Sequence, residues 1–184
     1  MAGIASKSQL RMSFLRYALF TVPALLLLGT LSGTLSGAGG GNAWFARLHK
    51  PPLMPPAWVF GAVWTLLYIL LGLSLAMVLH ARGAKTRRKA LTLFGAQILL
   101  TLAWPFVFFA YHRIETALAM TAAMFVIAVA MVFVNWRIRV LAGLLLYPFL
   151  GWLMFAGVLN YQILMRNPDA AALAPGPAST DIPL

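Results

Sequence analysis

The sequence predicts an all-α membrane protein: a bundle of five transmembrane helices with a proline-rich lid loop between helices 1 and 2. Three observations predict this class. Of the 184 residues, 62% are hydrophobic and 9% are charged, whereas an ordinary soluble domain is about 25% charged. The apolar residues fall into five runs of the roughly 20 residues needed to cross a bilayer. These runs lack the alternation of a barrel strand, so only helices can pair their backbone polar groups in lipid.

The first predicted helix covers residues 17–37 and follows a basic N-terminal tail at residues 1–16. Small residues recur in it at every fourth position, which favours close packing of a neighbouring helix; they are Gly29, Gly33 and Gly37. A basic leader, an apolar core and then Ser36-Gly37-Ala38 are also typical of a secretory signal peptide. That alternative stays open, although a discarded peptide has no need of helix-packing glycines.

The loop before the second helix is rich in proline, with Pro51, Pro52, Pro55 and Pro56 close together. Proline fixes φ and removes a backbone donor, so this segment is extended and stiff. We expect it to form a lid over the aromatic start of the next helix. The other predicted helices cover residues 57–79, 90–111, 116–136 and 140–165, within a transmembrane domain at 17–166, and residues 167–184 are expected to form a disordered tail.

The net charge of +11 would suggest nucleic acid in a soluble protein. Here the basic residues lie in tails and loops between apolar runs, so we expect contact with anionic lipid headgroups and no nucleic-acid partner. The N-terminal side holds Lys7, Arg11, Arg16, Arg82, Lys85, Arg87, Arg88, Lys89, Arg137 and Arg139; the opposite side holds Arg47, Lys50, Arg113 and Arg166. This excess predicts a cytoplasmic N-terminus, with the lid on the other side of a cell membrane rather than an organelle outer membrane.

Aromatic side chains recur at helical spacing on three of the predicted helices. The stripes are Phe60, Trp64 and Tyr68; then Gln97, Thr101, Trp104 and Phe108; then Phe149, Trp152 and Asn160. Core packing could explain such stripes, and interfacial belts could explain Trp44, Trp58 and Trp136. Amide groups at bilayer depth, however, need partners on another helix or a ligand. An aromatic cavity with a few polar anchors suits a flat apolar ligand, such as a tetrapyrrole or a sterol.

Several kinds of chemistry find no support in the sequence. The acidic residues, Glu115, Asp169 and Asp181, all lie outside the middle of the predicted helices, which argues against proton- or sodium-coupled transport. No hydrolase or phosphate-loop motif is present. The absence of cysteine excludes thiolate metal sites and covalent haem attachment. We expect no metal site, although His49 or His112 could ligate a haem iron from the lid side.

A weak cholesterol-type pattern ends the fifth helix at Val158, Tyr161 and Arg166. It matches many helix ends by chance and carries little on its own.

Taken together, these residues resemble the TspO/MBR family of tryptophan-rich sensory proteins and peripheral benzodiazepine receptors, over about residues 42–167. The matching positions include Trp44, Lys50-Pro51, Pro55-Pro56, Trp58-Val59-Phe60, Trp64, Tyr68, Gln97, Trp104, Pro148, Trp152, Asn160 and Asn167. The resemblance implies a five-helix bundle, often dimeric, that binds porphyrins, haem, sterols and synthetic benzodiazepine-type ligands beneath the first loop. It also implies that Trp64 and Trp152 match tryptophans implicated in light-dependent porphyrin breakdown, and that Tyr68 matches a pocket residue.

The sequence departs from the family pattern at four places. Pro52-Leu53 stands where an aromatic often follows Lys-Pro, Thr101 where a bacterial relative has Asn, Phe149 where Tyr is usual, and Arg139 where Asp is frequent. These changes bear on how a ligand is anchored, and so on which ligand it is.

The leading hypothesis is a membrane receptor or sensor for a tetrapyrrole (porphyrin or haem, held non-covalently), with sterol-like lipids as further ligands. The predicted binding residues are Trp44, Pro55, Pro56, Trp58, Phe60, Trp64, Tyr68, Gln97, Thr101, Trp104, Phe108, Phe149, Trp152 and Asn160. Two alternatives stay open: photo-oxidative porphyrin degradation with Trp64 and Trp152 as electron donors, which would make the protein an enzyme, and a lipid or tetrapyrrole carrier.

Overall fold

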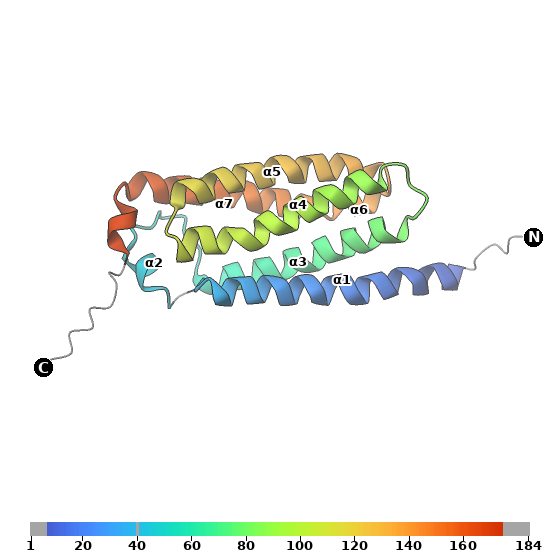
Figure 1. Cartoon of the computed structure of the whole chain (residues 1–184), viewed down its shortest axis with the longest axis horizontal. Coiled ribbons are helices and arrows are strands. Elements are labelled where there is room, and N and C mark those ends of the chain that lie inside the picture. The colour runs from blue at the N-terminus through green and yellow to red at the C-terminus, as the bar shows by residue number, and fades with distance from the viewer. Residues whose placement is uncertain (1–6, 40, 175–184) are drawn as a thin grey trace, which may run out of the picture.

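The structure, a computed structural model, describes residues 7–39 and 41–174 and contains no strand within those ranges. Five membrane-length apolar helical segments lie side by side in one bundle (Figure 1). They are α1 (Lys7–Leu35), α3 (Ala57–His80), α4 (Arg87–Pro105) with the π-helical turn η1 (Phe106–Ala110), α5 (Ile114–Trp136), and α6 (Val140–Leu144) with α7 (Tyr147–Arg166). The predicted all-α membrane fold with five spans is confirmed. A short helix α2 (Ala43–Arg47) lies in the first loop, and a 3-10 turn η2 (Ala170–Leu173) follows α7.

The helix ends differ from the predicted ones where hydropathy and helicity do not coincide. Helix α1 begins at Lys7 rather than at residue 17, because polar residues outside the hydrocarbon can still continue a helix. The last span is broken between α6 and α7, and Pro148 lies in the first turn of α7, where its missing N–H is not needed.

The segment after α7 also differs from the expected disordered tail. Ala170 is buried, and residues 170–173 form the turn η2. Residues 175–184 lie outside the described part of the chain.

The bundle has two layers (Figure 1). Helix α1 packs along α3 in one layer, and α5 packs against α4, α6 and α7 in the other. Helix α3 meets α4 and α6 more sparingly. Helix α1 also meets α4, where the Ser32 hydroxyl donates to the Leu102 carbonyl at 2.6 Å, so the layers are joined toward both ends of the bundle.

The close packing of α1 against α3 depends on Gly72. A Cβ at this position would lie 2.8 Å from the Cα of Val22, so only glycine lets the two backbones come this close. The hydroxyl of Thr21 donates to the Gly72 carbonyl at 2.7 Å. The sequence analysis did not single out this glycine.

The glycines that were predicted to pack helices have other surroundings. No atom lies within 4 Å of a Cβ built at Gly33, and Gly37 follows the end of α1 with φ +70°. Within the described chain no neighbouring helix packs on these two glycines, so their helix-packing role stays a prediction. At Gly29 the ring of Tyr68 occupies the space that a Cβ would need.

The half of the bundle near the α3–α4 turn is solid and its polar groups are mostly paired. The Ser74 hydroxyl donates to the Ala142 carbonyl at 2.7 Å and accepts from the Asn135 amide at 3.2 Å. A Cβ at Gly143 would lie 3.0 Å from the Val132 carbonyl oxygen. Helices α3, α5 and α6 are thus held together at this end.

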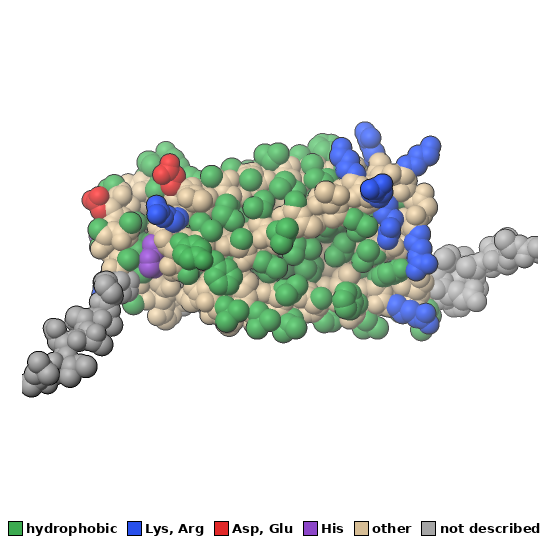
Figure 2. Space-filling model, in the orientation of Figure 1, with side chains coloured by type: hydrophobic (Ala, Val, Ile, Leu, Met, Phe, Trp, Pro, Cys, Tyr) green, Lys and Arg blue, Asp and Glu red, His purple; other side chains and the backbone are tan. Residues whose placement is uncertain are grey.

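The basic residues gather at this same end. Figure 2 shows Lys and Arg side chains clustered at the end where the chain begins, with apolar side chains over the middle of the visible face. The basic side chains that the structure describes here are Arg16, Arg82, Lys85, Arg87, Arg88, Lys89, Arg137 and Arg139. We call this the basic end and the opposite end, which holds α2, the lid end. A cytoplasmic basic end stays a prediction.

Candidate functional site

A cavity of about 740 Å³ occupies the lid end of the bundle, between the two helix layers. Its walls come from α1, α3, α4 with η1, α5 and α7, and the α1–α3 loop closes part of it through Phe45, Met54 and Pro55. Ligand pockets typically measure about 300–1,000 Å³, so the space can hold one large planar molecule.

Aromatic rings from three helical segments line the cavity. Helix α3 contributes Phe60, Trp64 and Tyr68, α4 with η1 contributes Trp104, Phe108 and Phe109, and α7 contributes Trp152. Trp104 and Phe108 stack with their centroids 5.0 Å apart and an interplanar angle of 11°. Phe60 meets Trp152 edge-on at 5.6 Å, so one ring pair bridges the two layers.

The π-helical turn η1 explains why two consecutive phenylalanines face the cavity. Pro105 has no N–H to continue the α-helical ladder, and the N–H of Tyr111 then bonds to the Phe106 carbonyl, five residues back, at 2.9 Å. Such π turns occur often at functional sites. The wider turn brings both Phe108 and Phe109 to the cavity wall.

Two polar groups in the cavity wall lack a hydrogen-bond partner. Both side-chain atoms of Asn160 are buried and unpaired, and so is Nε1 of Trp152. In contrast, Nε1 of Trp104 donates to the Ala117 carbonyl at 2.8 Å and to Thr121 Oγ1 at 2.9 Å. Leaving a buried polar group unpaired costs about 1–3 kcal/mol, so Asn160 and Trp152 are the groups best placed to gain from a ligand.

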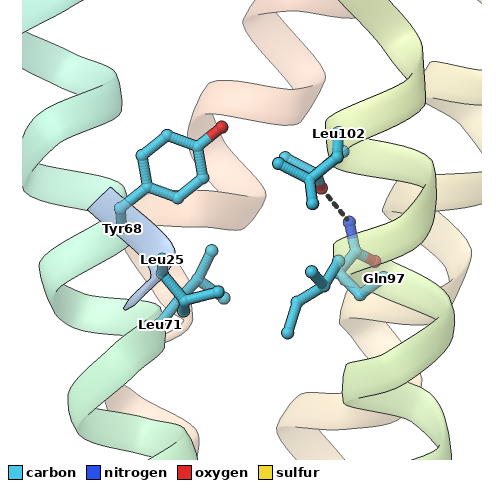
Figure 3. Close-up of a pocket in the computed structure, with 7 residues that line it drawn as sticks. Leu25, Tyr68, Leu71, Gln97 and Leu102 are labelled. Atoms are coloured by element: carbon cyan, nitrogen blue, oxygen red, sulfur yellow. Dashed lines mark hydrogen bonds between the residues drawn. The ribbon is translucent and has the colours of Figure 1, made fainter. Parts of the chain in front are cut away.

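Gln97 lies beside the cavity rather than in its wall. It lines a void of about 10 Å³ with Tyr68 and Thr101, and Figure 3 shows Gln97 and Tyr68 on opposite sides of this void. The Gln97 amide donates to Thr101 Oγ1 at 3.4 Å, and Thr101 Oγ1 approaches Met124 Sδ at 3.6 Å. Thr101 also reaches the main cavity, so it connects the two spaces.

The lid is fastened to the far end of α7 and the turn after it. Nε1 of the buried Trp44 donates to the Ala170 carbonyl at 2.8 Å. Asn167 accepts from the His49 N–H at 2.8 Å and donates to the His49 carbonyl at 3.0 Å and to the Ile163 carbonyl at 2.8 Å. Asn42 caps α2 by accepting from the Phe45 N–H at 2.8 Å. These bonds hold Phe45 over the cavity.

The structure divides the predicted binding residues into two groups. Those that line the cavity are Pro55, Phe60, Trp64, Tyr68, Thr101, Trp104, Phe108, Trp152 and Asn160. Five do not line it, namely Trp44, Pro56, Trp58, Gln97 and Phe149.

Each of these corrections has a physical reason. Trp44 fastens the lid, and Pro56 is the N-cap of α3. Trp58 is 73% exposed on the outer, lipid-facing side of α3. Phe149 is fully buried in the apolar core, with its ring centroid 6.4 Å from that of Trp64.

The sequence analysis missed Phe45, Met54 and Phe109 as lining residues. Asn42, a favourable N-cap residue, was the signal that could have predicted α2 and so placed Phe45. Pro105 could have indicated the irregular turn that brings in Phe109.

Other candidate residues lie away from the cavity. Val158 and Tyr161 are exposed on the outer face of α7. Neither His49 nor His112 lines the cavity, so the axial-ligand alternative has no histidine there. Within the described residues, no three His, Cys, Asp or Glu side chains form a group that could hold a metal ion.

Comparison with known proteins agrees with this geometry. Residues 20–166 match the model of the TspO/MBR family. The chain belongs to the TspO/MBR family. It is 35% identical to the translocator protein of Bos taurus over 153 residues, covering 79% of this chain and 90% of the relative. It is also 34% identical to the tryptophan-rich sensory protein of Cereibacter sphaeroides over 134 residues, covering 71% of this chain and 83% of the relative.

The four departures from the TspO/MBR pattern now have positions in the fold. Pro52 and Leu53 do not line the cavity, Phe149 is packed in the core, and Arg139 lies at the basic end. Only Thr101 contacts the cavity. Most of the departures therefore lie outside the cavity wall.

Proposed function

We propose that this TspO/MBR protein is a membrane receptor or sensor that binds a planar tetrapyrrole, porphyrin or haem, in the lid-end cavity. The observation that carries the proposal is an aromatic cavity of about 740 Å³ whose wall contains the unpaired Asn160 amide and Trp152 N–H. A guest with a large π surface and polar edges complements both features.

The rings supply the attraction and the polar groups supply the orientation. Aromatic pairs contribute about 0.5–1.5 kcal/mol beyond simple burial, and Trp64, Tyr68 and Trp104 offer such surfaces on two sides of the cavity. Lys50 also lines the cavity at the lid. Its ammonium group is the one basic side chain among the lining residues of the described structure, and it suits a propionate carboxylate of the tetrapyrrole.

The names of the relatives fit either a sensor or a carrier. One relative is called a sensory protein and another a translocator protein. A sterol has no planar π system and a single hydroxyl, so it would use the cavity volume but offer the aromatic rings no stacking partner and the polar groups only one hydrogen-bonding group. We therefore place tetrapyrroles ahead of sterol-like lipids. The homodimer implied by the family resemblance stays a prediction.

Binding can be tested by titrating protoporphyrin IX into the purified protein and following the shift of the porphyrin absorption band. The double variant Trp64→Ala/Trp152→Ala should weaken binding at least about tenfold, since two stacking surfaces are lost. Trp58→Ala is the matched control, because Trp58 lies on the same helix as Trp64 but faces outward. Equal porphyrin affinity of the double variant and the control would show that the cavity is not the porphyrin site.

The choice between ligand classes can be tested by thermal unfolding with porphyrins and with sterols. A ligand that binds only the folded state stabilises it by RT ln(1 + [L]/Kd), so at equal concentration the tighter ligand gives the larger rise in unfolding temperature. We expect porphyrins to give the larger rise, and Asn160→Leu to reduce the porphyrin effect more than any sterol effect. The opposite order would favour a sterol receptor.

A second candidate function, light-dependent porphyrin degradation, is favoured by the placement of Trp64 and Trp152 in one cavity. In this reaction the photoexcited porphyrin would accept one electron from an indole, which becomes a radical cation, and pass it to dioxygen, which becomes superoxide; superoxide would then attack the macrocycle. Illumination of the complex in oxygen should then bleach the porphyrin faster than in free solution. Bleaching no faster than that of free porphyrin would leave binding as the activity.

A further inference from the structure

A second cluster of interest lies at the basic end, far from the cavity. It joins four separate parts of the chain: Tyr17 on α1, His80 at the end of α3, Arg82 in the following turn, and Arg139 at the N-cap of α6. Arg82 donates to the Tyr17 hydroxyl from Nη2 at 2.8 Å and from Nε at 3.3 Å. Nη2 of Arg139 lies 3.1 Å from Nδ1 of His80. The Tyr17 and His80 rings meet edge-on, with centroids 6.5 Å apart.

Among the described residues, no carboxylate contacts either guanidinium of this cluster. Both are held by uncharged partners, a phenol and an imidazole, and both are exposed. Glu115 and Asp169, the acidic residues within the described structure, lie at the lid end. Each guanidinium has five N–H donors, so most donors of Arg82 and Arg139 remain available to an anion. The other basic side chains of this end add to the attraction.

The surroundings of the cluster indicate where such an anion would come from. Tyr17 lies in the membrane-spanning part of α1, where Leu15, Leu19 and Phe20 expose apolar side chains. A soluble phosphate would use the guanidinium groups and ignore this apolar surface. A phospholipid would use both, with its phosphate on the arginines and an acyl chain along α1.

We propose that the Tyr17, His80, Arg82 and Arg139 cluster is a binding site for the phosphate of an anionic phospholipid. The planar guanidinium of arginine can donate two parallel hydrogen bonds to phosphate oxygens. Tyr17 orients the guanidinium of Arg82, and His80 orients that of Arg139. The lipid links α1, the α3–α4 turn and the start of α6 at the membrane surface. This site is independent of the ligand in the cavity.

The test uses the full chain in detergent with phosphatidylglycerol or phosphatidylcholine, and counts retained lipid by native mass spectrometry. We expect preferential retention of one phosphatidylglycerol molecule. Arg82→Gln/Arg139→Gln should weaken this retention at least about tenfold, the loss expected when charge-assisted hydrogen bonds are removed. Tyr17→Phe, which keeps all charges but frees Arg82, should weaken it by a smaller factor.

The matched control is Arg88→Gln/Arg137→Gln, which removes the same charge from exposed residues at the same end but outside the cluster. It should change retention by less than about twofold, because exposed charges are screened. Equal losses in both double variants would overturn the proposal in favour of diffuse charge attraction. Full competition by glycerol phosphate at the concentration of the lipid would overturn it in favour of a soluble phosphate. Thermal unfolding in phosphatidylcholine verifies that all variants are folded.

Discussion

The basic end and the lid end of the bundle contain the same helices but are packed in opposite ways. At the basic end, Gly72 brings α1 and α3 together until a Cβ would be 2.8 Å from a neighbouring Cα. At the lid end, the space beside Gly33 is empty to 4 Å and belongs to a cavity of about 740 Å³. Helices in lipid gain little from the hydrophobic effect on associating, so close backbone approach and interhelical hydrogen bonds decide where they close.

The polar side chains follow the same division. Thr21 and Ser74 each donate to a backbone carbonyl of another helix, whereas Asn160 at the lid end has no partner. The division is not complete, because the Asn135 side-chain oxygen at the basic end is also buried without a partner, and the Ser32 hydroxyl toward the lid end donates to the Leu102 carbonyl. What distinguishes Asn160 and the Trp152 N–H is that they lie in the wall of a large cavity, where a further molecule can reach them. This is the physical basis for the proposed function.

The largest expected effect comes from exchanging glycine for alanine at the two ends. Gly72→Ala should lower the free energy of unfolding by about 1–3 kcal/mol, because overpacking against the α1 backbone outweighs the gain in helix propensity. Gly33→Ala should leave it unchanged or raise it by up to about 1 kcal/mol, since nothing opposes the added methyl. Thermal unfolding in detergent measures both. Changes of the same sign would contradict the contrast between the ends.

The next effect concerns the buried polar groups. Ser74→Ala removes the bond to the Ala142 carbonyl and leaves the Asn135 side-chain N–H without its acceptor, so we expect a loss of about 1–3 kcal/mol in the free energy of unfolding. Asn160→Leu removes groups that are already unpaired, and should cost nothing in stability while weakening porphyrin binding. Unfolding curves and porphyrin titrations of the two variants decide this. A stability loss in Asn160→Leu equal to that in Ser74→Ala would show that the Asn160 amide already has partners in the ligand-free protein.

A smaller and more local effect is expected at the lid. Asn167→Ala removes three hydrogen bonds that fasten His49 and the end of α7, and should ease local opening of the lid by about 1 kcal/mol. Hydrogen exchange of residues 43–50 should then be faster, and bound porphyrin should dissociate sooner. Arg166→Ala, an exposed neighbour, serves as control. Unchanged exchange in Asn167→Ala would mean that Trp44 alone holds the lid.

The smallest effect is a pH dependence at His112. This residue lies between the spans with its ring 4.5 Å from that of Trp44, and burial lowers its pKa below the usual value. His112 therefore takes up its proton at a higher pH in the unfolded chain than in the folded one. The free energy of unfolding should accordingly fall as the pH drops through the ordinary histidine pKa of about 6.5. His112→Asn should reduce this slope, since Asn tolerates the positive φ of 57° found here. Identical pH profiles of the two proteins would contradict it.

The five spans and the aromatic stripe of α3 in the cavity wall could be predicted from the sequence, because both depend on local spacing. Phe60, Trp64 and Tyr68 recur at one helical period and indeed share the cavity. The same spacing puts Trp58 on another side of α3, which its exposure confirms. Helical periodicity alone could therefore have removed Trp58 from the site.

The hydrogen bonds that hold the lid, and the place where α1 and α3 pack closely, could not be predicted in this way. Trp44 and Ala170 are 126 residues apart, and His49 and Asn167 are 118 apart, so no local pattern connects them. Glycine spacing in α1 pointed to Gly33, whereas the contact is made by an isolated glycine on α3. A single helix carries no information on which neighbour approaches it.

The π-helical turn after Pro105 amounts to one residue more than a regular helix would need at that place. Deleting one residue from 106–110 should restore the ordinary ladder and rotate every later position of the segment by about 100°. The chain before Pro105 would keep its register, and the end of the third span, with the remaining phenylalanines, would turn away from the cavity. The wall on this side of the cavity therefore depends on one turn of the third span.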